Sequence, residues 1–322
     1  MTGLVDRVAG APITWGVCEV PGWGWQLAPD RVLGEMAGIG LSATELGPEG
    51  FLPGEPDSLR RLLDGHGLRL VAGFLLISLH EEEGLKERLA GAAAYADLLA
   101  QAGAEVLVLA ASGTGKDYEN SAELDGDQWS TLVSGIERMA DVAGERGLAL
   151  AVHPHHGTAI ERPAHVERLL ETSSVSLCLD TGHLMVGGAD PLDVVRSASE
   201  RVAHVHMKDG VAAWAERVRS GRSGYAEAVR GGMYRSLGTG DLDIEGIVRT
   251  LHEGGYRGWY VLEQDTVLEA APEEGDGPMR DAAASLEFFR RVVAPLDQKS
   301  PTGSAGRGGA AWEATSHARE EG

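Results

Sequence analysis

The sequence predicts an α/β protein that forms one (β/α)8 TIM barrel, and three observations support this. Eight short apolar runs alternate with longer amphipathic segments along most of the 322 residues. Several runs are apolar almost throughout, as in a parallel sheet that is covered on both faces. No glycine-rich phosphate-binding fingerprint follows the first run, which disfavours an open doubly wound sheet. Such a barrel fills this length as one domain, so we expect it over residues 1–296.

The predicted strands and helices follow in order along the chain. The strands are residues 12–16, 42–46, 68–74, 106–110, 148–153, 175–180, 203–207 and 259–263. The helices between them are residues 29–38, 58–65, 85–102, 129–146, 163–171, 191–199 and 244–253. Several helices end in glycine just before a strand, as in AGERGLALAV at 143–152, which is typical of a left-handed cap and a short connecting loop.

Two stretches depart from this alternation. Residues 208–240 separate the seventh strand from the last helix and contain a helical piece at 212–231. Because this insertion follows the carboxyl end of a strand, we expect it to fold over the active face as a lid. Residues 297–322 are rich in Gly, Ser, Ala and charge without periodicity, so we expect a disordered tail.

Composition excludes several classes of function. The 28 basic and 49 acidic residues give a net charge of −21, which opposes binding to the phosphates of nucleic acids. No run of 18 apolar residues is present, and the first residues do not resemble a secretory signal. Cys18 and Cys178 lie far apart in apolar segments, which suits a reduced interior. We therefore expect a cytoplasmic protein with no nucleic-acid or membrane partner.

Polar side chains at the predicted strand ends should meet at the mouth of the barrel. These residues are Glu45, His153, Asp180, His206 and Glu263, with His155, His156, Glu161, His183 and Lys208 just beyond them. Carboxylates together with imidazoles are typical ligands of a divalent metal. We expect Mn²⁺ or Co²⁺, with Fe²⁺, Zn²⁺ or Mg²⁺ as alternatives.

Several of these residues have a structural interpretation as well as a functional one. Asp180 could hold a metal or cap the following helix. His204 and His206 lie on the same side of their strand, and the position at the strand end favours His206 as the ligand. Glu263 ends the final strand, where a carboxylate needs a cation or a hydrogen-bond network. Glu161 could be a ligand or could belong to the first turn of the next helix.

Trp15 and Lys208 are candidate substrate-binding residues. Trp15, Trp23 and Trp25 cluster after the first strand, where they could stack on a sugar or cyclitol or simply close the end of the barrel. Lys208 could steady a developing oxyanion or form a surface ion pair with Asp209.

Seven stretches form an ordered set from residue 11 to about residue 295. They read APITW at 11–15, ELGPEGFLP at 45–53, HPHHGTAIERPAHVERLLE at 153–171, LCLDTGHLMVGGADPLDVV at 177–195, HVHMKD at 204–209, EAVRGGMYRSLGTGDLD at 227–243 and GYRGWYVLEQD at 255–265. The set resembles the xylose-isomerase-like superfamily of sugar isomerases and epimerases, and within it the inosose dehydratases. One departure is the loop GVCEVPG at 16–22, where we expect an Asn-Asp pair in typical inosose dehydratases.

The resemblance implies a metal held by Glu, Asp, His and Glu on barrel strands. Asp180, His206 and Glu263 match three of these positions, and Glu161 is the expected fourth ligand, with His153 in reserve. His183 matches a histidine that faces the substrate in the epimerases. His155 and Glu45 are further expected substrate contacts.

The function implied is metal-assisted dehydration of a keto-cyclitol such as 2-keto-myo-inositol, with Glu263 or Glu161 as the base and His183 as the acid. A ketose 3-epimerase or an aldose–ketose isomerase would use the same site. A homo-oligomer is also expected, because barrels of this group often associate.

Overall fold

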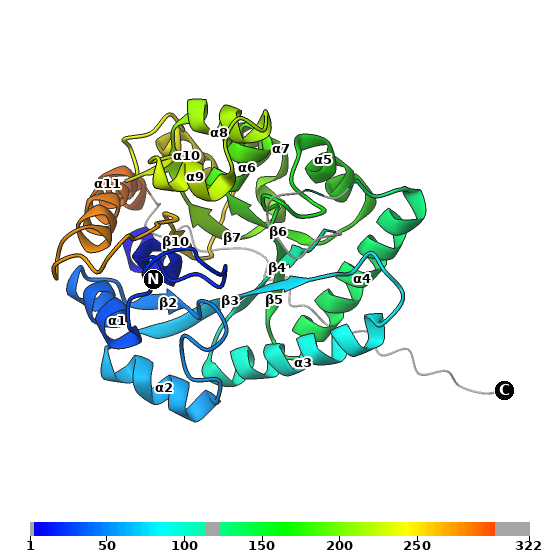
Figure 1. Cartoon of the computed structure of the whole chain (residues 1–322), viewed down its shortest axis with the longest axis horizontal. Helices are drawn as coiled ribbons and strands as arrows, with labels where there is room; N and C mark the ends of the chain where they lie inside the picture. Colours follow the sequence, from blue (N-terminus) through cyan, green and yellow to red (C-terminus); the bar gives the residue numbers. More distant parts are fainter. Residues whose placement is uncertain (1–2, 114–120, 122, 300–322) are drawn as a thin grey trace.

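The computed structural model describes residues 3–113, 121 and 123–299, and it confirms the predicted barrel (Figure 1). Eight parallel strands close into a barrel in the order β1-β10-β7-β6-β5-β4-β3-β2. The strands are β1 (Val8–Gly10), β2 (Ala43–Glu45), β3 (Arg69–Ile77), β4 (Val106–Ala111), β5 (Ala149–Val152), β6 (Ser176–Asp180), β7 (Val202–Met207) and β10 (Tyr260–Leu262). Seven of them overlap the predicted strands, so the apolar runs located the barrel correctly.

The first strand is the exception. It was predicted at residues 12–16, but β1 lies earlier, and Pro12–Trp15 form the short 3-10 helix η2. Proline lacks a backbone N–H and is well suited to the first position of a helical turn. Gly16 ends this turn with φ of 79°, a left-handed conformation that glycine adopts readily. The true strand is the three-residue segment Val8–Gly10, and the prediction placed the strand on the neighbouring run at residues 12–16 instead.

Helices surround the barrel on the outside (Figure 1). They are α1 (Pro29–Gly38), α2 (Pro56–Gly65), α3 (Leu85–Ala102), α4 (Gly126–Gly144), α5 (Pro163–Thr172), α6 (Thr181–Gly187), α7 (Pro191–Ala198), α10 (Ile244–Glu253) and α11 (Pro278–Lys299), with the 3-10 turns η1 (Leu4–Asp6) and η3 (Ser199–Arg201). The predicted bounds of α1, α3 and α10 are confirmed. The glycine after α4, Gly147, has φ of 75°, as the predicted cap requires.

Helices α6 and α11 were not predicted. Helix α11 extends past residue 296, and the Asp297 carboxylate accepts the backbone N–H of Leu4 at 3.0 Å. Asp297 therefore belongs to the folded body, and the predicted disordered tail does not begin there. The rest of that prediction, for residues 300–322, lies outside the described residues.

The insertion after β7 is a small structure of its own. Strands β8 (Asp209–Gly210) and β9 (Tyr234–Arg235) pair antiparallel at its base. The predicted single helical piece is two helices, α8 (Ala212–Arg219) and α9 (Tyr225–Arg230), interrupted where Gly221 has φ of 67°. The Asp209 carboxylate accepts the backbone N–H groups of Gly238 and Gly240, which fixes the returning chain.

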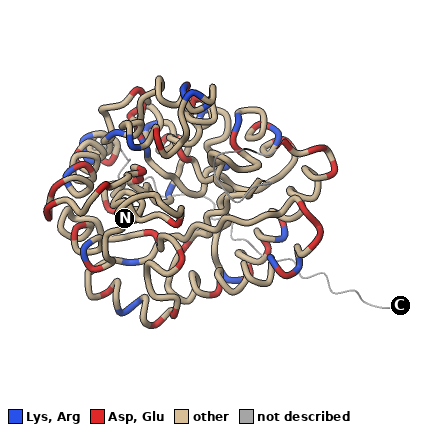
Figure 2. Tube along the Cα trace, in the orientation of Figure 1, with Lys and Arg blue, Asp and Glu red and all other residues tan. Residues whose placement is uncertain are grey.

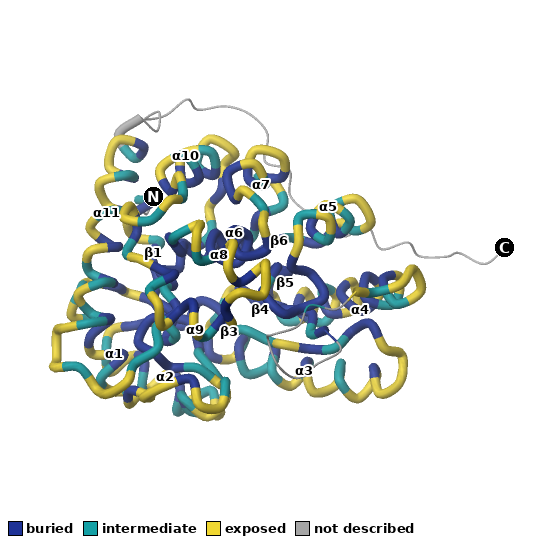
Figure 3. The backbone as a smooth tube through the Cα atoms, turned by 45° about the horizontal axis from the view of Figure 1, so that its top comes forward, coloured by how far each residue is buried: buried dark blue, intermediate teal, exposed yellow. Residues whose placement is uncertain are grey.

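Burial follows the expected layers (Figure 3), because the strands are buried and the outer faces of the helices are exposed. Most acidic and basic residues lie on the outer helices and loops (Figure 2). The charged residues buried at the barrel mouth are the exceptions that define the site.

Candidate metal centre and active site

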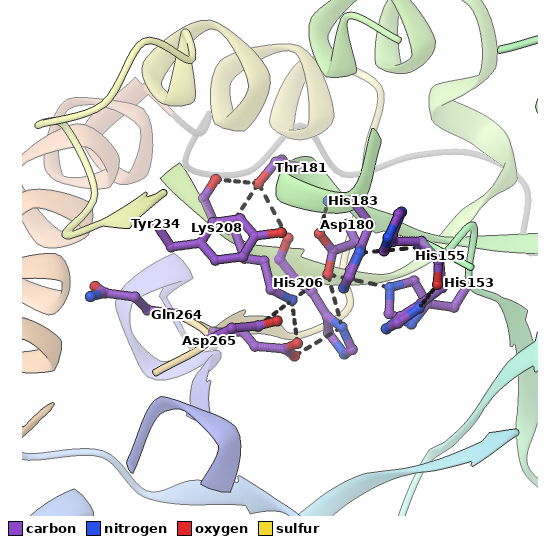
Figure 4. Close-up of polar contacts among 12 residues, drawn as sticks. His153, His155, Asp180, Thr181, His183, His206, Lys208, Tyr234, Gln264 and Asp265 are labelled. Atoms are coloured by element: carbon purple, nitrogen blue, oxygen red, sulfur yellow. Dashed lines mark hydrogen bonds and ion pairs between the residues drawn. The ribbon is translucent and has the colours of Figure 1, made fainter. Parts of the chain in front are cut away.

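A cavity of about 990 Å³ opens at the carboxyl-terminal end of the barrel strands. The predicted residues that line it are Glu45, His153, His155, His183, His206 and Glu263. Figure 4 shows His153, Asp180 and His206 converging from neighbouring strands. The strand ends therefore meet at one mouth, as the sequence predicted.

Asp180 uses its two carboxylate oxygens for two different roles. Oδ1 accepts the backbone N–H of His183 at 2.7 Å and so caps helix α6. Oδ2 lies 2.6 Å from Lys208 Nζ, 3.3 Å from His153 Nε2 and 3.5 Å from His206 Nδ1. The sequence left the ligand and the cap as alternatives, and this geometry permits both at once.

Lys208 is fully buried among three carboxylates. Its ammonium group pairs with Asp180 and Glu263 and lies 3.5 Å from Asp265 Oδ1. Burial alone would lower the pKa of Lys208, but Asp180 and Glu263 raise it well above its ordinary value. Lys208 therefore stays positively charged next to Asp180 and Glu263, and the predicted alternative of a surface ion pair is wrong.

His206 is oriented by Glu45. Glu45 Oε1 accepts hydrogen bonds from His204 Nε2 at 2.7 Å and from His206 Nε2 at 3.0 Å. Burial alone would lower the pKa of the His206 imidazole, but Cys178, Glu263 and Glu45 raise it well above its ordinary value. Nδ1, which faces Asp180 and Glu263, would therefore release its proton when it binds a metal. Glu45 was predicted to bind substrate. It does line the cavity, but the oxygen that faces these histidines is already engaged.

Asp180, His206 and Glu263 form a group that could hold a metal ion, because their ligand atoms lie within 4.8 Å of one another. His206 Nδ1 is 3.0 Å from Glu263 Oε2, yet it has no hydrogen-bond partner among the described residues. A buried nitrogen between two carboxylates suits a divalent cation that accepts mixed O and N ligands. The structure thus brings together three of the four predicted ligands. Overlapping groups are His153–Asp180–His183, Glu45–His204–His206 and His153–Cys178–His206.

The structure does not bring Glu161 into this group. Its carboxylate accepts a hydrogen bond from His156 Nδ1 at 2.6 Å, and Glu161 is not among the described residues that line the cavity. The loop turns back after β5, where the His155 N–H donates to the Ile160 carbonyl at 2.9 Å. His153, at the end of the strand, lies closer to Asp180 Oδ2.

His155 and His183 stack at the cavity wall with their ring centroids 3.8 Å apart. Burial lowers the pKa of both imidazoles well below the ordinary value, so both rings are neutral at pH 7. His155 Nδ1 donates to the His156 carbonyl at 2.7 Å, which leaves Nε2 as the lone-pair nitrogen. His183 Nδ1 accepts the His156 N–H at 3.4 Å, which places its proton on Nε2. The two rings thus have opposite tautomers.

Trp15 was predicted to contact substrate, but it is fully buried in the core. Its indole N–H donates to Glu35 Oε2 at 2.8 Å. We expect Trp15→Phe to lower the free energy of unfolding by about 2–3 kcal/mol, because it removes a buried hydrogen bond to a carboxylate. The KM should remain at the wild-type value. Urea denaturation and steady-state kinetics check both parts, and a raised KM with unchanged stability would restore the substrate role.

Sequence reasoning missed a cluster beside the metal group. The Tyr225 hydroxyl donates to Asp265 Oδ2 at 2.6 Å and lies 3.0 Å from the Tyr234 hydroxyl. The Tyr225 ring also stacks on His156 and His183. Asp265 could have been found, since it lies two residues after Glu263 and so on the same side of an extended chain. Tyr225 lies on the insertion, where the sequence has no pattern that predicts which side chains face the site.

We expect Asp265 to make the stability of the protein depend on pH. Burial raises the pKa of this carboxyl group from 3.8 to about 6, although Lys208 and Tyr225 oppose the shift. Between these values the folded state binds more protons than the unfolded state, so stability falls as the pH rises. We expect Asp265→Asn to remove this penalty, and its advantage over wild type should grow by roughly 1–3 kcal/mol between about pH 4 and pH 7. Chemical denaturation across this range checks it, and a constant difference would contradict it.

Comparison with known proteins agrees with this fold. The family model for xylose isomerase-like TIM barrels matches residues 33–292. The chain therefore belongs to the xylose isomerase-like TIM barrel family, as the sequence motifs predicted.

Curated relatives match nearly the whole chain. An inosose dehydratase of Geobacillus kaustophilus (strain HTA426) is 31% identical over 298 residues, which cover 89% of this chain and 94% of that relative. The rhizopine catabolism protein MocC of Rhizobium meliloti is also 31% identical over 296 residues, which cover 89% of both chains.

Solved structures share the fold at lower identity. The IolI protein, solved with a bound zinc atom, has a TM-score of 0.67 at 14% identity and covers 90% of this chain and 98% of its own. A D-tagatose 3-epimerase-like protein has a TM-score of 0.65 at 14% identity and covers 92% of this chain and 100% of its own.

In the described part of the chain, no helix is both long and apolar enough to cross a bilayer.

Proposed function

We propose that this protein is a metal-dependent lyase that dehydrates a keto-cyclitol such as 2-keto-myo-inositol. The observation that carries the proposal is the buried group of Asp180, His206 and Glu263, which the ends of three different strands bring together beside the cavity. The inosose dehydratases among its relatives support this substrate class.

The metal would be held by Asp180, His206 and Glu263, with His153 rather than Glu161 as the fourth candidate ligand. We propose Mn²⁺ or Co²⁺, with Fe²⁺ or Zn²⁺ as alternatives, since the ligand set mixes oxygen and nitrogen; Mg²⁺, which prefers oxygen ligands, is the weakest alternative. When bound, such a cation supplies a Lewis acid that polarises a keto oxygen.

The protein's own residues move the protons. Glu263 lines the cavity and is the carboxylate that removes the proton next to the keto group. His183 carries its one ring proton on Nε2 and delivers it to the departing β-hydroxyl as water leaves, and the proton that Glu263 took from the substrate returns to His183 to complete the cycle. Lys208 stays charged behind Glu263 and holds it in place, and we therefore give Lys208 a positioning role rather than direct contact with substrate.

The experiment is incubation of the metal-loaded protein with 2-keto-myo-inositol. We expect the ultraviolet band of the dehydrated dione to appear. A ketose 3-epimerase or aldose–ketose isomerase would share the first proton transfer, so sugar interconversion without that band would favour this alternative.

The two free cysteines support a cytoplasmic location. We also propose that the substrate is a small molecule and that the protein is a homo-oligomer.

A further inference from the structure

The cavity extends well beyond the residues that carry the proposed chemistry. The polar end contains His183, His206 and Glu263. From there the cavity continues between the loop after β2, the end of β3 and helix α3. We call this part the apolar arm, and it is lined by Pro48, Leu52, Leu76, Gly91, Tyr95 and Leu98.

Helix α3 presents one face to the apolar arm. Gly91, Tyr95 and Leu98 are spaced four and three residues apart, so they lie along a single side of the helix. Leu76, near the end of β3, lines the same arm and is 36% exposed, whereas most large apolar side chains of the described residues are buried. Exposure of a leucine inside a cavity that is continuous with a catalytic site suggests a ligand that covers it.

The arm and the polar end differ in what they can bind. A polyhydroxylated ring needs a hydrogen-bond partner for each buried hydroxyl, because an unpaired one is costly. The polar end offers imidazoles and carboxylates for this purpose. Of the six residues that line the arm, Tyr95 carries the one polar side-chain group, its hydroxyl, and the exposed Glu49 lines the cavity next to Pro48. The arm therefore suits an apolar group and not a second polyol.

We propose that the natural substrate is a keto ring that carries an apolar substituent, such as an alkyl or aryl ether, and that this substituent lies in the apolar arm. The inference rests on the proposed function, since it places the keto ring at Asp180, His206 and Glu263. The substituent takes no part in the elimination and contributes binding through buried apolar surface.

The test compares kcat/KM for 2-keto-myo-inositol with kcat/KM for its mono-O-methyl and mono-O-propyl ethers. For the ether series whose oxygen points into the arm, we expect a rise of about fourfold per buried methylene. All positional isomers of each ether are assayed, so that the correct one is included.

Gly91→Leu tests the location of the substituent. No heavy atom lies within 4 Å of a Cβ built on Gly91, so the larger side chain can be accommodated while it narrows the arm. We expect the preference for the propyl ether over the parent ketone to fall at least tenfold. The matched control is Gly34→Leu in α1, which is equally open, does not line the cavity, and should keep the wild-type preference. Leu76→Gln, similar in size but polar, should weaken the preference without narrowing the arm.

Three results would overturn this inference. If the parent ketone is dehydrated and no ether is preferred, the arm does not bind a substituent, while the proposed function stands. If neither the ketone nor any ether is dehydrated, the inference falls together with the proposed function. If Gly91→Leu changes the oligomeric state on gel filtration and leaves the ether preference intact, a second copy of the chain occupies the arm.

Discussion

Asp180→Asn should lower kcat/KM by at least about a thousandfold and should abolish tight metal binding. The substitution keeps the shape and the Oδ1 acceptor that caps α6, but it removes the charge that faces Lys208, His153 and His206. Without Asp180 the metal would no longer be held, and its stabilisation of the developing oxyanion would be lost. A loss of several kcal/mol corresponds to a thousandfold factor. Steady-state kinetics and calorimetric metal titration measure the two effects together.

Asp190→Asn is the matched control. Asp190 also caps a helix, since its side chain accepts the Leu192 N–H at 2.8 Å, but it is exposed and lies outside the cavity. Asparagine is an equally good cap, so this variant should behave as wild type. If both variants retain full activity, Asp180 is only a helix cap.

Glu263→Gln should lower kcat by about 10²–10⁴-fold, the range expected when a general base is lost. The amide keeps the size of the side chain, and Lys208 retains Asp180 and Asp265 as partners, so the fold should persist. Metal affinity should fall less than kcat, because two of the three ligands remain. Single-turnover kinetics and circular dichroism check turnover and folding separately.

Glu269→Gln is the matched control, because it makes the same substitution in the exposed loop after β10. It should leave kcat and metal affinity unchanged. Wild-type turnover by Glu263→Gln would exclude Glu263 as the base and would direct attention to His155, whose Nε2 carries a lone pair on the same cavity.

Much of the fold was predictable because its signals are local. The apolar runs located β2 to β7 and β10, and α1, α3 and α10 were predicted to their ends. The signal failed where tertiary context decides. Three residues suffice for β1 because both neighbouring strands pair with it. The helices of the insertion pack on Met185 and Val186. The periodicity of the insertion's own sequence does not reveal this contact.

The site was predictable where position on a strand determines direction. Asp180 and His206 lie at the carboxyl ends of their strands and Glu263 directly follows β10, so the barrel itself aims them at the mouth. Loop residues lack that constraint, and Glu161 turns toward His156 instead. Trp15 shows the same limit, because its partner Glu35 lies on another element.

Anomalous diffraction from crystals of the Mn²⁺-loaded protein tests the central claim most directly, because it locates the ion without any assay. We expect one strong peak that touches Asp180, His206 and Glu263 together. A peak between Glu45 and His204, a peak at Glu161, or no peak at saturating Mn²⁺ would contradict the account.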